Sequence, residues 1–233
     1  MFVIRRLSPK LEDGLLSGAA GVMLAAAVFS LLLPALEYAE LQYGSNETAV
    51  LLASAGLMIG AATLWLIHRY SPHEHFLVGP EGPKAKNLGR IWLFVIAITL
   101  HNFPEGMAVG VGFAGGDIEN GVTLMAGIGF QNIPEGLAVS VSLMTVGYSR
   151  RQAFLIGLLS GLVEPVGGLF GSVAVSVAAV LIPWSLAFAA GAMLFIISDE
   201  IIPETHRRGF ENLATFSLLA GFCVMLLLDA LLT

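Results

Sequence analysis

The residues of this chain best suited to chemistry lie in two copies of one short motif. Residues 101–106 read HNFPEG, and residues 131–136, which begin 30 positions later, read QNIPEG. Each copy places a carboxylate, Glu105 or Glu135, near the middle of an apolar segment. A charge buried in a membrane costs several kcal/mol unless a partner neutralises it. The matched spacing therefore predicts that the two copies hold a cation between them inside a bilayer.

The first copy brings its polar side chains together. His101 and Glu105 are four residues apart, so they share one face of a helix, and Asn102 lies beside that face. Pro104 has no N–H, which leaves the Leu100 carbonyl without its helical partner. A carbonyl in that state is tolerated inside a membrane only against protein or a polar cavity. The residues around His101 therefore favour a polar site over a lipid-facing surface.

The second copy and the next apolar segment complete a set of metal ligands. Gln131, Asn132 and Glu135 repeat the arrangement, and Glu164, followed by Pro165, lies near the middle of the next segment. An imidazole, three carboxylates and amide oxygens suit Zn²⁺, and also Fe²⁺, Mn²⁺ and Cd²⁺. The single cysteine stands alone in an apolar run, and the lack of thiolate argues against Cu(I). An oxygen-rich site is also more labile than a closed cysteine cage, as a transporter requires.

Composition indicates the elements that must position these side chains. Hydrophobic residues make up 56% of the 233 residues and charged residues 12%, which is about half the charged fraction of soluble domains. A membrane span needs about 20 mostly apolar residues. The sequence therefore predicts an all-α integral membrane protein, a single transmembrane domain over 1–233 with seven spans at about 14–38, 48–68, 91–114, 121–147, 152–181, 184–206 and 212–232.

The positive charges predict how the chain crosses the membrane. All eleven Lys and Arg residues lie before the first span or in the loops after the second, fourth and sixth spans, whereas the opposite loops carry only acidic charges. By the positive-inside rule the N-terminus is cytoplasmic and the C-terminus periplasmic or extracellular, in a bacterial inner (plasma) membrane. The long loop 69–90, which is rich in Pro and Gly, is expected to be cytoplasmic and irregular.

Polar residues outside the motifs suggest where a cation enters and leaves. Glu37, which follows Ser30 at the outer end of the first span, could admit a cation, although an interfacial carboxylate in water explains it equally well. Asp199 and Glu200 lie in the inner half of the sixth span, and His206 follows them. These three residues could line an inward exit.

Histidines near the cytoplasmic loop leave two interpretations open. His68, His73 and His75 cluster with Glu74, and they form either a weak receiving or sensing site for metal or part of a flexible, solvated loop. Imidazole and carboxylate groups are ligands that zinc accepts, which keeps the first interpretation open. Asp229, near the outer end of the last span, is expected to be only interfacial.

At these residues the sequence resembles the ZIP family (Zrt/Irt-like proteins) of divalent metal transporters, and in particular its bacterial GufA-like branch. The resemblance covers nearly the whole chain. It rests on HNFPEG, QNIPEG, the Glu164-Pro165 pair and the stretch from Asp199 to His206. It implies an eight-helix bundle, of which this chain would lack the first helix. It also implies a binuclear site between the family's fourth and fifth helices, with a contribution from the sixth.

Carried over residue by residue, the resemblance implies two neighbouring metal positions. One would take an imidazole, two carboxylates and an amide, from His101, Glu105, Gln131 and Glu135. The other would take two amides and a carboxylate, from Asn102, Asn132 and Glu164, with the two motif carboxylates bridging the positions. Asn132 stands where some relatives place an Asp, which weakens the second position by one charge. Ser30 and Glu37 fall at the family's entrance, and the region of Glu200 matches its cytoplasmic exit.

We therefore expect a transporter that moves Zn²⁺ into the cytoplasm, with Cd²⁺, Fe²⁺ and Mn²⁺ as further candidate substrates. Its expected partners are the lipid bilayer and divalent metal ions. The sequence leaves undecided whether the chain forms a homodimer. Neither an organic cofactor nor nucleic acid is expected. An intramembrane enzyme is disfavoured, because the chain has neither the His-Glu-x-x-His of zinc proteases nor Glu-x-x-His pairs on two spans. A non-transporting metal-binding or sensor protein stays as the alternative, owing to the missing first helix.

Overall fold

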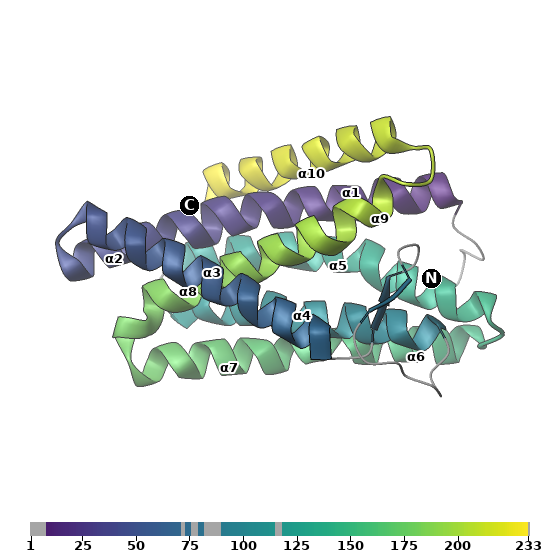
Figure 1. Ribbon diagram of the computed structural model, residues 1–233, viewed down its shortest axis with the longest axis horizontal. Coiled ribbons are helices and arrows are strands. Elements are labelled where there is room, and N and C mark those ends of the chain that lie inside the picture. Colours follow the sequence, from purple (N-terminus) through teal and green to yellow (C-terminus); the bar gives the residue numbers. More distant parts are fainter. Residues whose placement is uncertain (1–7, 71–72, 76–78, 82–89, 115–117, 233) are drawn as a thin grey trace.

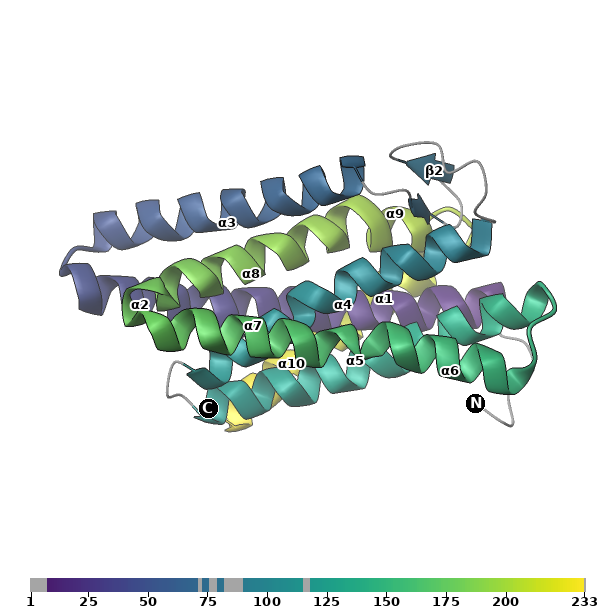
Figure 2. The same ribbon diagram turned by 90° about the horizontal axis from the view of Figure 1, so that it is seen from below.

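Seven long helical segments lie side by side along the length of the molecule, in the part of the chain that the structure describes (Figures 1 and 2). That structure is a computed structural model, and it describes residues 8–70, 73–75, 79–81, 90–114 and 118–232. Five of the segments are long and apolar enough to cross a membrane: Pro9–Tyr43, Asn46–Tyr70, Arg150–Val177, Ile182–Thr205 and Glu211–Leu231. The predicted class of all-α membrane protein is confirmed.

Three of the seven segments change their helical geometry along their length. The first consists of α1 (Pro9–Ala25), the π-helix η1 (Ala26–Leu32) and α2 (Leu33–Tyr43). The fifth is α6 (Arg150–Gly161) and α7 (Val163–Val177), with a break at Leu162, and the sixth is α8 (Ile182–Ile196), the π-helix η3 (Ile197–Ile201) and α9 (Ile202–Thr205). The other described helices are α3 (Asn46–Tyr70), α4 (Arg90–Ala114), α5 (Ile118–Thr145), the 3₁₀-helix η2 (Ala179–Leu181) and α10 (Glu211–Leu232).

The first helical segment extends beyond its predicted span at both ends. It begins at Pro9 and ends at Tyr43, before a left-handed Gly44. Hydropathy marks only the apolar length of a helix, whereas backbone hydrogen bonds continue through polar residues such as Glu12 and Glu40. The apolar run 14–38 is therefore the middle of this helical segment.

Part of the loop predicted to be irregular is a β-hairpin. β1 (His73–His75) pairs antiparallel with β2 (Gly79–Glu81), with His73 opposite Glu81. The side chains of His73, Glu74 and His75, and most of the rest of this loop, lie outside what the structure describes.

Glycines bring three pairs of helices into close backbone contact. α4 lies against α7, α1 against α10 and α3 against α8, and these are the most extensive contacts in the bundle. A Cβ added to Gly110 would lie 1.9 Å from the carbonyl oxygen of Gly168 across the α4–α7 pair. A Cβ on Gly21 would lie 1.9 Å from the carbonyl oxygen of Leu218 across the α1–α10 pair. Small residues at such crossings allow tight van der Waals packing, which drives helix association in lipid.

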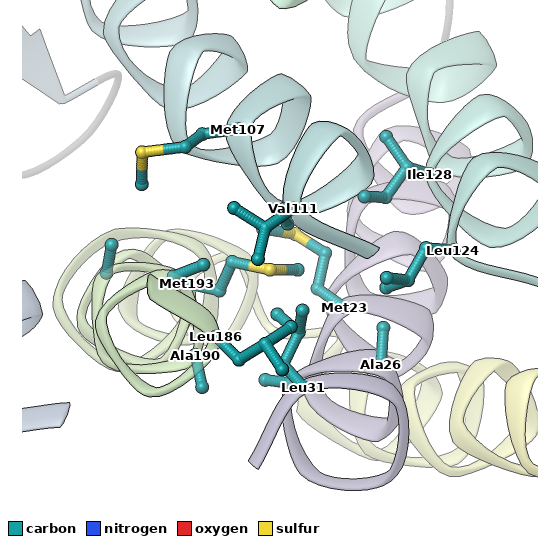
Figure 3. Packing of buried hydrophobic residues seen from close by; sticks show 14 of the residues in the cluster. Met23, Ala26, Leu31, Met107, Val111, Leu124, Ile128, Leu186, Ala190 and Met193 are labelled. Carbon is teal, nitrogen blue, oxygen red and sulfur yellow. The ribbon is translucent and has the colours of Figure 1, made fainter. Parts of the chain in front are cut away.

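Buried apolar side chains from most of the helices fill the centre of the bundle. Those labelled in Figure 3 come from α1, η1, α4, α5 and α8 and include Met23, Leu31, Leu124, Leu186 and Met193. The outer surface exposes large apolar side chains, among them Leu51, Leu159, Phe170 and Phe216. A bundle that is apolar on its outside as well as in its core is suited to lipid, not to water.

Candidate metal centre

The first copy of the motif lies in α4 with its polar side chains buried. His101 is 3% exposed, Asn102 is 4% exposed and Glu105 is fully buried. Pro104 stays inside the helix. The burial of all three polar residues agrees with the shared face that their spacing predicted.

The second copy lies in α5 and meets the first copy directly. Nε2 of Gln131 donates a hydrogen bond to Oε1 of Glu105 over 2.7 Å, and both side chains are buried. Glu135 is buried one turn further along α5, where it lines one small cavity together with Asn102 of α4. The duplicated motif therefore forms one polar group across the α4–α5 interface.

Glu164 joins this group from the first turn of α7. Pro165 has no N–H to offer the carbonyl of Gly161, and the helix breaks at Leu162 just before Glu164. Nδ2 of Asn132 donates to both oxygens of Glu164, at 2.8 and 2.7 Å. The structure thus pairs two of the residues expected to form the second metal position.

Asn102 lies beside the same group. Its Nδ2 donates to the backbone oxygen of Ser160 in α6 over 2.9 Å, so that its side-chain oxygen is the atom left for another partner. Asn102, Asn132, Glu135 and Glu164 also line one small cavity, of about 40 Å³. Every predicted ligand of the duplicated motif therefore lies within one cluster.

Several acceptor oxygens of this cluster are buried without a hydrogen bond from any described residue. They are Oδ1 of Asn102, Oε2 of Glu105, Oε1 of Gln131, Oδ1 of Asn132 and Oε2 of Glu135. A buried acceptor without a partner costs about 1–3 kcal/mol, and more when it carries charge. All five atoms are oxygens, and a divalent cation accepts several such ligands at once. The cluster therefore offers a divalent cation several oxygen ligands at once.

A second group of metal-ligating side chains lies next to the first. His68 in α3, His101 in α4 and Glu200 in η3 are all buried, and each offers one ligand atom within 4.8 Å of the other two. Oε2 of Glu200 is 2.5 Å from Nε2 of His101, and Oε1 is 3.2 Å from Nδ1 of His68. Asp199 is more exposed, with a carboxylate oxygen 3.9 Å from Nδ1 of His68. His101 therefore belongs to both groups.

The sequence predicts that His68 belongs to the cytoplasmic loop cluster, and that prediction is wrong. His68 is 2% exposed near the end of α3, where it faces Glu200. The buried face of α3 includes Gly56, Gly60 and Leu64, and His68 is the next residue in that four-residue spacing. Because i and i+4 positions share one face of a helix, this periodicity was the signal that could have placed His68 inside the bundle.

At the other end of the bundle, Ser30 has a partner that the sequence did not predict. Its Oγ donates to Oδ1 of Asp229 in α10 over 2.7 Å, and Nδ2 of Asn120 in α5 donates to its backbone oxygen. Ser30 is fully buried in η1, whereas Glu37 is exposed on α2. Asp229 was expected to be only interfacial, but it contacts the serine that the resemblance places at an entrance.

His206 lies in the turn after α9, with both ring nitrogens close to protein acceptors or donors. Nδ1 is 2.9 Å from the backbone oxygen of Ile202 and 3.1 Å from Oγ1 of Thr205. Nε2 is 3.2 Å from Oγ1 of Thr215 in α10. These contacts hold the turn against α10, and they leave Asp199 and Glu200 as the predicted exit residues that reach the metal-ligating groups.

Known proteins resemble this chain over most of its length. The sequence model of the family described as "ZIP Zinc transporter" matches residues 79–229. "Zinc transporter GufA" of Myxococcus xanthus is 50% identical over 201 residues, which cover 86% of this chain and 79% of that protein. "Zinc transporter ZIPB" of Bordetella bronchiseptica is 45% identical over 226 residues, 97% of this chain and 73% of that protein. Human "Zinc transporter ZIP11" is 34% identical, over 98% of this chain and 91% of that protein.

The fold and the buried polar centre define a multi-pass, all-helical membrane protein with metal-ligating side chains inside its bundle. Within that class, the chain belongs to the ZIP family of zinc transporters. The resemblance inferred from the duplicated motif is thereby confirmed.

Proposed function

We propose that this chain transports Zn²⁺ into the cytoplasm through the polar residues of α4, α5 and α7. The observation that carries the proposal is the set of five buried acceptor oxygens that no described residue satisfies, all from the duplicated motif. Their energetic cost within a membrane is removed when a cation binds among them. The relatives that share this family are named zinc transporters, which supports zinc as the substrate.

The metal occupies two neighbouring positions in this proposal. The first uses His101, Glu105, Gln131 and Glu135, and the second uses Asn102, Asn132 and Glu164, with Glu105 and Glu135 shared. The hydrogen bond from Gln131 to Glu105 and those from Asn132 to Glu164 support these two sets, since each joins members of one set. Asn132 contributes an amide rather than a carboxylate, so the second position carries less negative charge.

The next metal-binding site toward the cytoplasm consists of His68, His101 and Glu200. Because His101 belongs to both groups, a metal ion moving inward keeps one protein ligand throughout the step. The three ligand atoms within 4.8 Å of one another support this role, and Asp199 lies beside them at a more exposed position. From there the ion passes into the cytoplasm. Mixed imidazole and carboxylate ligands also admit Cd²⁺, Fe²⁺ and Mn²⁺.

The entrance lies at the opposite end, at Ser30 and Asp229. The hydroxyl of Ser30 and the carboxylate of Asp229 are oxygen ligands that a divalent cation accepts, and their mutual hydrogen bond joins η1 to α10 until a cation replaces it. Glu37, exposed on α2, attracts cations to that end. A homodimer of this single transmembrane domain is compatible with the apolar outer surface.

The proposed orientation of the chain in the membrane follows from the positive charges. The beginnings of α1 and α6 and the turn between α9 and α10 lie at one end of the bundle (Figure 1), and they carry Lys10, Arg150, Arg151, Arg207 and Arg208. The positive-inside rule makes this end cytoplasmic. Alkaline phosphatase is active only outside the cytoplasm, so a fusion of this enzyme to the C-terminus should be active. If that fusion is inactive while a fluorescent protein fused to the C-terminus fluoresces, the C-terminus is cytoplasmic and the proposed orientation is wrong.

Zinc uptake into proteoliposomes tests the transport function. The wild type should take up zinc, and a Glu105→Ala/Glu135→Ala variant should not, because it loses the two carboxylates shared by both positions. Glu40→Ala is the matched control, since it removes an exposed carboxylate from α2 and should leave uptake unchanged. Equal uptake by the wild type and the double variant would refute the proposed site.

A further inference from the structure

An ion-pair cluster joins two helices at the end of the bundle assigned to the cytoplasm. Nη1 of Arg208, in the turn after α9, donates to Oε2 of Glu12 over 2.7 Å and lies 3.4 Å from Oδ1 of Asp13. Nη2 of the same guanidinium lies 3.5 Å from Oε1 of Glu204. Glu12 and Asp13 belong to α1, and Glu204 belongs to α9. One guanidinium thus holds carboxylates of both helices together.

The cluster is largely shielded from water. Asp13 is 1% exposed, and the side chain of Arg208 is 13% exposed. Burial by itself lowers the pKa of Arg208, but the hydrogen bond and charge of Glu12, with the charges of Asp13 and Glu204, outweigh burial and raise that pKa. The arginine therefore stays charged. Without it, the carboxylates of the two helices would repel one another at close range.

The helix that carries Glu200 depends on contacts such as these. Glu200 lies in the π-helix η3, one turn before Glu204, and the intervening Pro203 has no N–H for a backbone hydrogen bond. π-helical turns are rare, and they frequently occur at functional sites. The position of this segment is therefore set from both sides, by His68 and His101 at Glu200 and by the arginine cluster at Glu204.

We propose that Arg208 is a positioning residue for the inner metal group, because it ties the end of the helix that carries Glu200 to α1. The inference rests on the proposed function, in which Glu200 is a ligand of the departing metal. Arg208 does not touch the metal in this role. It keeps Glu200 within reach of His68 and His101 while the ion passes.

Zinc affinity of the purified 233-residue chain, measured by competition with a chromophoric chelator, tests the proposal. Arg208→Gln should weaken zinc binding at the group of His68, His101 and Glu200 about tenfold, the low end of what supporting residues contribute to metal sites, while zinc binding at the motif residues persists. Arg208→Lys should weaken zinc binding less, because lysine keeps the positive charge but lacks the second nitrogen with which the guanidinium reaches carboxylates of both helices. Arg207→Gln is the matched control, because Arg207 is the exposed neighbour in the same turn, and it should bind zinc as the wild type does.

A second background separates positioning from general destabilisation. In a Glu200→Gln chain, adding Arg208→Gln should change zinc affinity less than twofold, because the residue being positioned is already lost. The positioning role is overturned if Arg208→Gln lowers zinc affinity equally in the presence and absence of Glu200. It is also overturned if Arg208→Gln binds zinc as tightly as Arg207→Gln does. If the Arg208→Gln variant is not monodisperse, the same comparison is made with Arg208→Lys in the wild-type and Glu200→Gln chains. A wild type that binds no zinc would instead refute the proposed function itself.

Discussion

The two motif glycines lie in different environments, and this difference yields a sharp prediction. Gly106 ends the first copy, and a Cβ added there would lie 2.0 Å from the carbonyl oxygen of Glu164. Gly136 ends the second copy, and a Cβ added there meets nothing within 4 Å. Gly106→Ala should therefore displace the backbone of Glu164, whereas Gly136→Ala, which adds a methyl group at the edge of the small cavity, should leave the backbone in place.

The size of the disturbance follows from the contact distances. Ordinary van der Waals contact begins near 3.4 Å, so a Cβ on Gly106 requires the backbone of Glu164 to move by about 1.4 Å. Overpacking of this kind costs about 1–3 kcal/mol. Because Glu164 is a proposed ligand and moves with its backbone, we expect zinc affinity to fall about 10–100-fold, as it does when the supports of a metal ligand are lost. Gly136→Ala should instead gain up to about 1 kcal/mol from helix propensity.

Thermal unfolding and zinc affinity of both variants in the same detergent would measure these effects. Gly106→Ala should unfold at a lower temperature than the wild type and bind zinc weakly, and it should be inactive in the proteoliposome assay. Gly136→Ala should match or exceed the stability of the wild type and retain uptake. If the two alanine variants behave alike, the close approach of α4 and α7 does not control the position of Glu164, and the reasoning fails.

Three further substitutions test separate contacts. Asn132→Asp removes the amide that bonds both Glu164 oxygens and adds a charge, so the metal-free protein should lose about 1–3 kcal/mol and gain more stability from zinc than the wild type in thermal melts. His68→Ala should slow zinc uptake while zinc binding persists at the motif residues; complete loss of binding in a titration would contradict the two-group arrangement. Trp92→Phe loses the hydrogen bond to Tyr148 and should cost about 0.5–1.5 kcal/mol of stability with uptake unchanged, and a large fall in uptake would argue against a purely structural role.

The centre of the site could be predicted because its residues are repeated at helical spacing within one stretch of sequence. His101 and Glu105 share a face by the four-residue rule, and the second copy repeats that face one helix later. Glu164 could be added because a carboxylate in an apolar span is itself a signal. Local periodicity and the cost of a buried charge therefore sufficed to collect these residues.

The partners contributed by distant helices could not be predicted in the same way. Ser30 and Asp229 are 199 residues apart, and nothing in local spacing links η1 to α10. Glu200 was assigned to an exit, but its contact with His101 depends on how α4 packs against η3 and α3. Such contacts are set by helix crossings, which depend on close approach at glycines rather than on the order of polar residues.

The π-helix η1 has a consequence for the length of this chain in evolution. A π segment holds one residue more than an α-helix needs to connect the same two ends. Deleting a residue from an ordinary helix turns everything beyond it by about 100° and moves buried faces to the outside. Within Ala26–Leu32 the wide turn could instead relax to α-helical geometry, so that α1 would keep its contact with α10 and α2 its contact with α3. Single-residue gaps in alignments of related chains are therefore expected to fall in this segment more often than elsewhere in the spans.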